Sequence, residues 1–373
     1  MRILHISQSN GGVERYLLML LKHLAKFEVQ NILLCSNEFN VEDFNTLTQS
    51  VVQIPMVREI NFKKDFSAVF AVRHIINEVK PDIVYCHSSK AGVIGRIASI
   101  GLKTKVLYNA HGWAFNMKVP KYKQIIYGFV EGILSILTDK IICISENEKR
   151  SALKHNICAE RKLRLIYNGV DVDALECRIF QNKIFRSDLK ISEDAFVVGM
   201  VGRISEQKSP KDFIQMARVV KDYVPNSFFL IVGDGPERSD VEKLIFQLGL
   251  SDSVLITGWV SNPIDYVNLF DVSVLLSSWE GFGLVLVEYM IAKKAIVATN
   301  VDAIPEVVRN GECGLLVNSG DYESAARFVM NLYNDGDLKT KLEESAYNDA
   351  KQRFSMSRVA EEHMLVFQDM INM

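Results

Sequence analysis

The sequence lacks both a surplus of charge of one sign and any long apolar run. Its 373 residues include 43 Lys and Arg against 45 Asp and Glu, a formal net charge of −2. A chain so near neutrality carries no general electrostatic signal for nucleic acid, so we expect no nucleic-acid partner. No run of about 18 or more apolar residues is present, which excludes a membrane-spanning helix on sequence grounds.

Paired cysteines are missing as well. None of the six cysteines forms a C-x-x-C pair or lies near a histidine at the spacing of zinc ligands. Free thiols in a chain of this length are typical of a reduced compartment. The first residues, from Met1 to Ser7, lack the long apolar stretch of a signal peptide. We therefore expect a cytoplasmic protein.

What the sequence does contain is an alternation of strand and helix patterns. Hydrophobic residues make up 48% and charged residues 24%, which is ordinary for a globular protein. Short apolar segments predict buried parallel strands at residues 2–6, 32–35, 83–86, 106–108 and 140–144. Amphipathic segments at 12–26, 65–79 and 91–100 predict helices between them. This alternation favours a doubly wound α/β sheet.

The same rhythm restarts after a polar, irregular segment at 171–194, which we interpret as a linker. A second set of strands is predicted at 196–201, 228–232, 254–257, 272–276 and 295–298. Helices are predicted at 210–223, 237–248 and 284–292, and three more close the chain at 322–333, 338–354 and 357–370. We expect two α/β domains, 1–172 and 173–355.

A pair of glycines, Gly11 and Gly12, follows the first strand within the motif Ser9-Asn10-Gly11-Gly12. Glycines at a turn from strand to helix let backbone N–H groups approach a phosphate, although a tight turn alone would also explain them. The pattern is not G-x-G-x-x-G, which argues against a dinucleotide-binding oxidoreductase.

The motif Gly202-Arg203…Lys208 follows the first strand of the second domain. Guanidinium and ammonium groups both suit phosphate, and ligands of α/β sheets bind at the carboxyl ends of strands. Two solvated surface cations are the simpler alternative.

A third motif runs from Ser278 to Glu288 after another apolar strand. Its glycines, among them Gly283, free a turn, and the N–H groups of Leu284 and Val285 would open a helix toward an anion. Glu280 precedes that helix and Glu288 lies one turn inside it. Two carboxylates beside a phosphate site suit recognition of sugar hydroxyls, although an exposed acid and a helix-dipole partner are the alternatives.

Smaller signals accompany these motifs. His111 precedes a glycine at the end of a predicted strand, where a histidine is either structural or part of a site. Gly233-Asp234-Gly235-Pro236 is a glycine turn after a strand, and Asn168-Gly169 is a turn at the expected domain boundary.

Taken together, these motifs resemble the retaining glycosyltransferases of family 4. The E-x7-E pattern of Glu280 and Glu288 is the most specific part of the likeness, which covers nearly the whole chain. The resemblance implies a GT-B fold, in which two Rossmann-like doubly wound domains face each other across a cleft. It also implies that the final helix, 356–373, packs back on the first domain.

The resemblance implies roles for individual residues. Arg203 and Lys208 would stabilise the leaving diphosphate, and the N–H groups of Leu284 and Val285, after Gly283, would contact phosphate. Glu288 would bind ribose hydroxyls and Glu280 the donor sugar. The base would lie near Gly258 and Val260, Gly12 would approach the phosphate, and His111 would lie near the transferred sugar. No metal or other cofactor is needed in this scheme, and the sequence offers no convincing D-x-D site.

The implied reaction moves a hexose or N-acetylhexosamine from a nucleotide sugar, by default UDP-linked, to a glycan or lipid-linked acceptor in bacterial surface polysaccharide. Residues Met117 to Tyr127 carry Lys118, Lys121 and Lys123 without an acid, which suits either peripheral contact with an anionic membrane or a solvated helix face. An epimerase-like enzyme without transfer and a non-catalytic sugar-binding subunit remain as alternatives.

Overall fold

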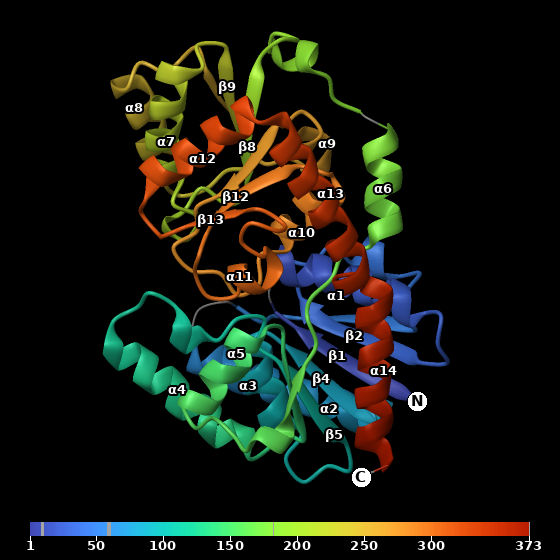
Figure 1. Ribbon diagram of the computed structural model, residues 1–373. Helices are drawn as coiled ribbons and strands as arrows, with labels where there is room; N and C mark the ends of the chain where they lie inside the picture. The colour runs from blue at the N-terminus through green and yellow to red at the C-terminus, as the bar shows by residue number, and fades with distance from the viewer. Residues whose placement is uncertain (9–10, 58–60, 182, 373) are drawn as a thin grey trace. The chain divides into compact units, whose positions relative to one another are not determined.

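The computed structural model describes residues 1–8, 11–57, 61–181 and 183–372. These divide into two compact units, one formed by Met1–Asn168 with Met356–Met373 and the other by Gly169–Ser355 (Figure 1). The division falls four residues before the expected boundary at 172. Val170 bonds to the backbone of Phe354, and Asp171 accepts from the N–H of Ala174, so this stretch belongs with the second unit.

The first unit is built on a parallel sheet of seven described strands in the order β3-β2-β1-β4-β5-β6-β7. The strands are β1 (Arg2–Ser7), β2 (Gln30–Ser36), β3 (Ser50–Ile54), β4 (Ile83–His87), β5 (Lys105–Asn109), β6 (Lys140–Cys143) and β7 (Leu163–Leu165). Its helices are α1 (Gly12–Leu24), α2 (Phe62–Val79), α3 (Ser89–Ala98), α4 (Lys121–Ser135), α5 (Glu146–Lys154) and α14 (Met356–Asn372).

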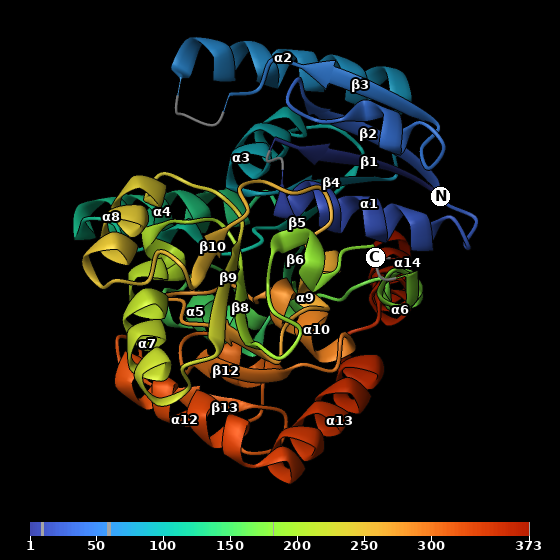
Figure 2. The same cartoon turned by 90° about the horizontal axis from the view of Figure 1, so that it is seen from above.

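Helices cover both faces of this sheet because successive strand residues point to opposite sides. Leu4 and Ile6 of β1 pack with apolar residues of α2 and α3. Ile3 points the other way and packs with Tyr16 of α1 and Val359 of α14. Figure 2 shows strands β1, β2 and β3 lying between α2 and α1. The last helix of the chain thus completes the core of the first unit.

The second unit repeats the design with six described strands in the order β10-β9-β8-β11-β12-β13. The strands are β8 (Phe196–Val201), β9 (Ser227–Val232), β10 (Val254–Ile256), β11 (Val272–Leu275), β12 (Ala295–Thr299) and β13 (Leu315–Val317). Its helices are α6 (Val172–Gln181), α7 (Pro210–Tyr223), α8 (Arg238–Gln247), α9 (Ile264–Val267), α10 (Leu284–Ile291), α11 (Ile304–Val307), α12 (Tyr322–Asn334) and α13 (Gly336–Arg353). The α/β, doubly wound prediction is confirmed for both units.

The interpretation of 171–194 as an irregular linker is wrong, because the segment begins with helix α6. Val172 and Leu175 of this helix are buried, and Arg178 forms two hydrogen bonds to Asp265 of α9, at 2.6 and 2.5 Å. The helix was not recognised in the sequence because few of its residues are apolar and buried, so the segment shows no clear helical period. Strands β3, β7 and β13 were also not predicted, since each is short and only partly buried.

Among the described residues, no helix is both long enough and apolar enough to cross a bilayer.

Helix α4 is held on the first sheet by a buried charged cluster. Glu131 accepts from the guanidinium of Arg96 and from the hydroxyl of Tyr108, both at 2.8 Å. Arg96 also lies 4.0 Å from the centre of the Tyr108 ring. Removing one partner of such a pair leaves an uncompensated buried charge.

We expect Glu131→Ala to lower the free energy of unfolding by about 3–5 kcal/mol, because it leaves the buried Arg96 cation without a counter-charge. Denaturant titration followed by circular dichroism measures this. Glu160→Ala is the matched control in the same unit, since it removes an exposed partner of Lys149 and should change stability far less. Equal effects of the two substitutions would contradict the assignment.

Candidate active site

The predicted donor-site residues of the second unit collect at the carboxyl edge of its sheet. Strand order reverses between β8 and β11, which are neighbours in the sheet although the strands β9 and β10 lie between them in sequence. The loop after β8 carries Arg203 and Lys208, and the loop after β11 carries Glu280. Ligands of open α/β sheets bind outside the carboxyl ends of strands at such a reversal. The topology thus brings the loops that carry the three side chains to one edge of the sheet.

Two glycines allow the loops after β8 and β9 to touch through their backbones. A Cβ atom at Gly233 would lie 2.1 Å from the carbonyl oxygen of Gly202, and one at Gly235 would lie 2.2 Å from that of Ile204. The Ile204 N–H donates to the Asp234 carbonyl at 2.9 Å. The loop after β9 therefore fixes the backbone path of the Arg203 loop.

Lys208 and Glu280 form an ion pair across the reversal point, between Nζ and Oε2. Ser277 Oγ donates to the same Oε2 at 3.3 Å. Both side chains of the pair are largely buried, at 14% and 10% exposure, so solvent screens the pair weakly. Arg203 is exposed, and its guanidinium has no hydrogen-bond or ion-pair partner within the described part of the chain.

Further hydrogen bonds join the two loops. Ser278 N–H donates to the Gln207 carbonyl at 2.8 Å, and Ser209 Oγ lies 2.8 Å from Ser278 Oγ. Asp302, after β12, accepts from the Glu280 N–H at 2.9 Å. These contacts hold the Glu280 carboxylate beside Lys208. Sequence reasoning missed them, since serine and glutamine in loops give no distinctive signal.

Helix α10 begins directly after Gly283, whose φ of 82° suits glycine. The N–H groups of Leu284 and Val285 are in its first turn, where no carbonyl four residues earlier belongs to the helix. Both residues are partly exposed, whereas Glu288 is buried one turn further in. The helix is anchored to β8, because the Val201 N–H donates to Tyr289 Oη at 2.7 Å.

The loop after β10 continues the same edge. Gly258 forms an isolated bridge with Gly233, so it lies beside the loop that supports Arg203. The next residue, Trp259, is 74% exposed, and Val260 is partly exposed. Gly258 and Val260 thus follow a strand that is two strands from the one before Lys208 and three from the one before Glu280.

In the first unit, Gly12 and His111 also follow strands, β1 and β5. Gly11 has a φ of 74° and precedes α1, and neither glycine would bring a Cβ into contact with a neighbour. Ser9 and Asn10 lie outside the described residues. His111 is partly exposed with a φ of 53°, a region that non-glycine residues seldom adopt outside turns and functional sites. Its N–H donates to Asn109 Oδ1 at 2.9 Å.

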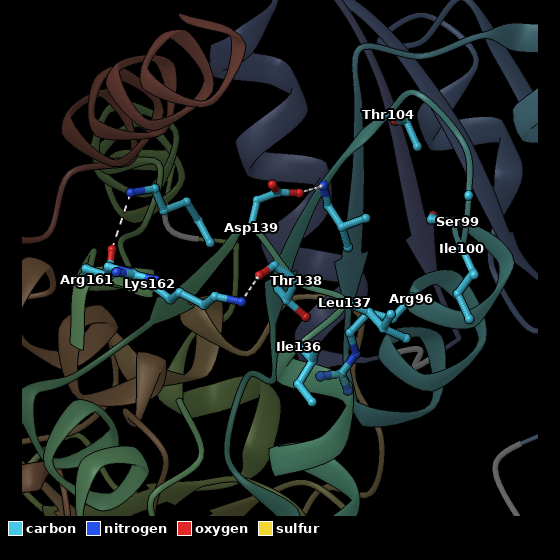
Figure 3. A pocket seen from close by; sticks show the side chains of 13 residues that line it. Arg96, Ser99, Ile100, Thr104, Ile136, Leu137, Thr138, Asp139, Arg161 and Lys162 are labelled. Carbon is cyan, nitrogen blue, oxygen red and sulfur yellow. Dashed lines mark hydrogen bonds between the residues drawn. The ribbon is translucent and has the colours of Figure 1, made fainter. Parts of the chain in front are cut away.

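Figure 3 shows a pocket at the opposite edge of the first sheet, where β5 and β6 begin. Its polar groups hold the fold together. Lys162 donates to the carbonyl oxygens of Ser135 and Thr138 at the end of α4, each at 2.8 Å, and Asp139 accepts from the Val106 N–H at 2.7 Å. We therefore assign this pocket no part in the site.

Comparison with known proteins defines the class. The family model "Glycosyltransferase Family 4" matches residues 10–174, and "Glycosyl transferases group 1" matches residues 181–349. HepE of Anabaena, solved with UDP and glucose, is 21% identical, with a TM-score of 0.85 over 99% of both chains. The protein is a glycosyltransferase with the two Rossmann-like units of the GT-B class.

More narrowly, the chain belongs to the glycosyltransferases of family 4 and group 1. An Escherichia coli UDP-Gal:alpha-D-GlcNAc-diphosphoundecaprenol alpha-1,3-galactosyltransferase is 28% identical over 87% of this chain and 85% of its own. The capsular polysaccharide biosynthesis glycosyltransferase CapM of Staphylococcus aureus is 27% identical over 83% and 82%.

Because Gly233 supports the Arg203 loop, we expect Gly233→Ala to weaken binding of UDP, the nucleotide in the HepE structure, by roughly 5- to 150-fold. The added Cβ would overlap a backbone oxygen, and relief by backbone movement costs about 1–3 kcal/mol. Isothermal titration calorimetry measures the affinity. Gly336→Ala, where a Cβ meets nothing within 4 Å, is the matched control. Wild-type affinity in Gly233→Ala would contradict the role of this contact.

Proposed function

We propose that this glycosyltransferase moves a hexose or N-acetylhexosamine, with retention of configuration and without a metal ion, from a UDP-sugar to a glycan or lipid-linked acceptor. The pathway we propose is bacterial surface polysaccharide synthesis. The observation that carries the proposal is the Lys208–Glu280 pair beside Arg203 and the first turn of α10, all at one strand reversal. The names of the relatives, which include a UDP-galactose transferase and a capsule enzyme, support the donor and acceptor classes.

Lys208 can serve both Glu280 and a phosphate, because an ammonium group has three donors. One donor holds Glu280 Oε2, which leaves two for phosphate oxygens. Within the described residues, no side chain other than Lys208 and Ser277 donates to Glu280, and both contact Oε2. Oε1 is therefore the atom that accepts from hydroxyls of the donor sugar.

In the proposed reaction, the bond between the anomeric carbon and the diphosphate oxygen breaks as the acceptor hydroxyl attacks the same face. The hydroxyl proton passes to the departing phosphate oxygen, so no enzyme nucleophile is required. Negative charge grows on the diphosphate as it leaves. Arg203, Lys208 and the N–H groups of Leu284 and Val285 would stabilise that charge, as preorganised donors do in other transferases.

The first test is equilibrium binding of UDP, GDP and NAD to the pure protein in EDTA. We expect UDP to bind and NAD not to bind. Arg203→Ala and Lys208→Ala should each raise the barrier to transfer by roughly 2.7–4 kcal/mol, the range for loss of one charge-stabilising donor. Glu280→Ala should lower kcat while UDP affinity stays near that of the wild type, because Glu280 contacts the sugar rather than the nucleotide.

Lys211→Ala is the matched control, because this neighbouring lysine of α7 pairs with the exposed Asp240 of α8. It should leave transfer unchanged. Near-normal rates in the Arg203 and Lys208 variants would overturn the donor site. Free UDP released only when an acceptor is present would argue against an epimerase-like enzyme, and UDP binding without any turnover would favour a non-catalytic subunit.

We also propose that the acceptor side of the enzyme contacts an anionic membrane through α4. Large exposed apolar side chains recur along one face of this helix at Tyr122, Ile125, Ile126, Phe129, Ile133 and Ile136. The stripe is longer than the predicted segment, which ended at Tyr127. The only acid of α4, Glu131, is buried against Arg96 and Tyr108. The exposed face therefore carries only lysines and apolar groups, as membrane-surface helices do.

Replacing Ile125 and Phe129 together by serine should lower partition into phosphatidylglycerol vesicles roughly tenfold or more, because each apolar side chain buried contributes about 1.5–3 kcal/mol. Vesicle sedimentation at low salt measures this. Phe246→Ser is the matched control, since Phe246 is 79% exposed on α8 of the other unit. If the wild-type protein did not bind anionic vesicles, the membrane proposal would be contradicted, whereas the transferase proposal would be unaffected.

A further inference from the structure

Three histidine rings form a hydrogen-bonded row in the first unit. His5 Nδ1 lies 3.2 Å from His87 Nε2, and His87 Nδ1 lies 3.2 Å from His111 Nε2. At the far end, His5 Nε2 lies 3.1 Å from Oδ1 of Asn31. Asn31, His5 and His87 are buried, whereas His111 is partly exposed at the end of the row.

The row follows from the register of the sheet. Its members come from β2, β1, β4 and the residues after β5, which is the order of these strands in space. Each step crosses one strand and advances two residues toward the carboxyl end. The register pairs that define the steps are Ile3 with Asn31, Tyr85 with His5, and Asn109 with His87. Residues two apart share a face, so the row runs diagonally to the edge of the sheet.

The protons in this row are countable. A nitrogen-to-nitrogen hydrogen bond holds one proton, and a neutral imidazole carries one N–H and one lone pair. With the Asn31 amide oriented as in this structure, Oδ1 faces the ring and can only accept, so His5 Nε2 is protonated and its Nδ1 is bare. His87 Nε2 must then donate to His5, and His111 Nε2 must donate to His87. The acceptor at Asn31 therefore sets the tautomer of all three histidine rings.

Desolvation favours the neutral form of all three rings. It lowers the pKa of His5 to about 4 and that of His111 to about 3, and it lowers the pKa of His87 well below its ordinary value. Another buried histidine, His363, lies outside the row. Its Nδ1 donates to the Val359 carbonyl at 2.7 Å, and its Nε2 accepts from Tyr85 at 2.9 Å.

We infer that Asn31, His5 and His87 are positioning residues that fix His111 as the Nε2–H tautomer, so that its Nδ1 offers a lone pair to substrate. The ligand group this tautomer selects is a donor, such as a sugar hydroxyl, and not another acceptor. This inference rests on the proposed function for the identity of the substrate. The tautomer itself follows from the row alone.

Two-bond 1H–15N spectra of histidine-labelled full-length protein, without substrate, report which ring nitrogens carry protons. We expect protonated Nε2 and bare Nδ1 at His5, His87 and His111, with His111 assigned by His111→Asn. In Asn31→Leu the first acceptor is gone, so His111 should become a mixture of tautomers. We expect kcat to fall about ten- to a hundredfold, as when groups that orient a functional histidine are removed, with UDP affinity unchanged.

Ile32→Ala is the control for damage to the strand, because Ile32 is adjacent to Asn31 but packs on the opposite face of the sheet. It should lower stability and leave the His111 tautomer and kcat as in the wild type. A proton on His111 Nδ1 in the wild type, or an unchanged tautomer in Asn31→Leu, would overturn the inference. The wild-type spectra need no ligand, and their assignment needs only His111→Asn, so they remain decisive even if Asn31→Leu fails to fold or the protein binds no UDP.

Discussion

One constraint underlies every site in this molecule: all strands of each sheet are parallel, so every loop that follows a strand leaves at the same edge. In the second unit this brings together loops that are far apart in sequence, after β8, β9, β10, β11 and β12. Each of these loops contacts the next, from the Gly258–Gly233 bridge to the bond between Asp302 and the Glu280 N–H. The edge therefore acts as one surface rather than as five independent turns.

Within that surface, the glycines determine how closely the loops approach, and the charged side chains determine the electrostatics. The glycines at 233 and 235 permit backbone contact that no side chain would allow, and this sets where Arg203 can reach. The Lys208–Glu280 pair then keeps two largely buried charges compensated while no ligand is bound. An unpaired charge in that position would be costly. The pair thus lets the fold place a cation at this edge, where we propose that a diphosphate binds, without leaving that cation uncompensated.

Much of this could be predicted from the sequence, and the failures have physical causes. The buried strands and the motifs at Arg203, Lys208 and Glu280 stand out because apolar runs and glycine turns are local patterns. Helix α6 was missed because only Val172 and Leu175 give it a buried face. The bonds of Gln207 and Ser278 depend on two loops that only the folded sheet makes neighbours. His5 and His87 could have been noticed as polar residues inside apolar strands, but their row requires the register.

The two units share a topology but differ in the charge at the carboxyl ends of their strands. The edge of the second unit gathers Arg203, Lys208 and a helix N-terminus, which together favour a negatively charged ligand. Near the strand reversal of the first sheet, between β1 and β4, lie neutral rings instead. Burial excludes charge from those rings, so the only chemical choice left to them is which nitrogen holds a proton. A neutral ring with a bare nitrogen can accept a hydrogen bond from a hydroxyl. We therefore propose that the first sheet controls a tautomer rather than a charge.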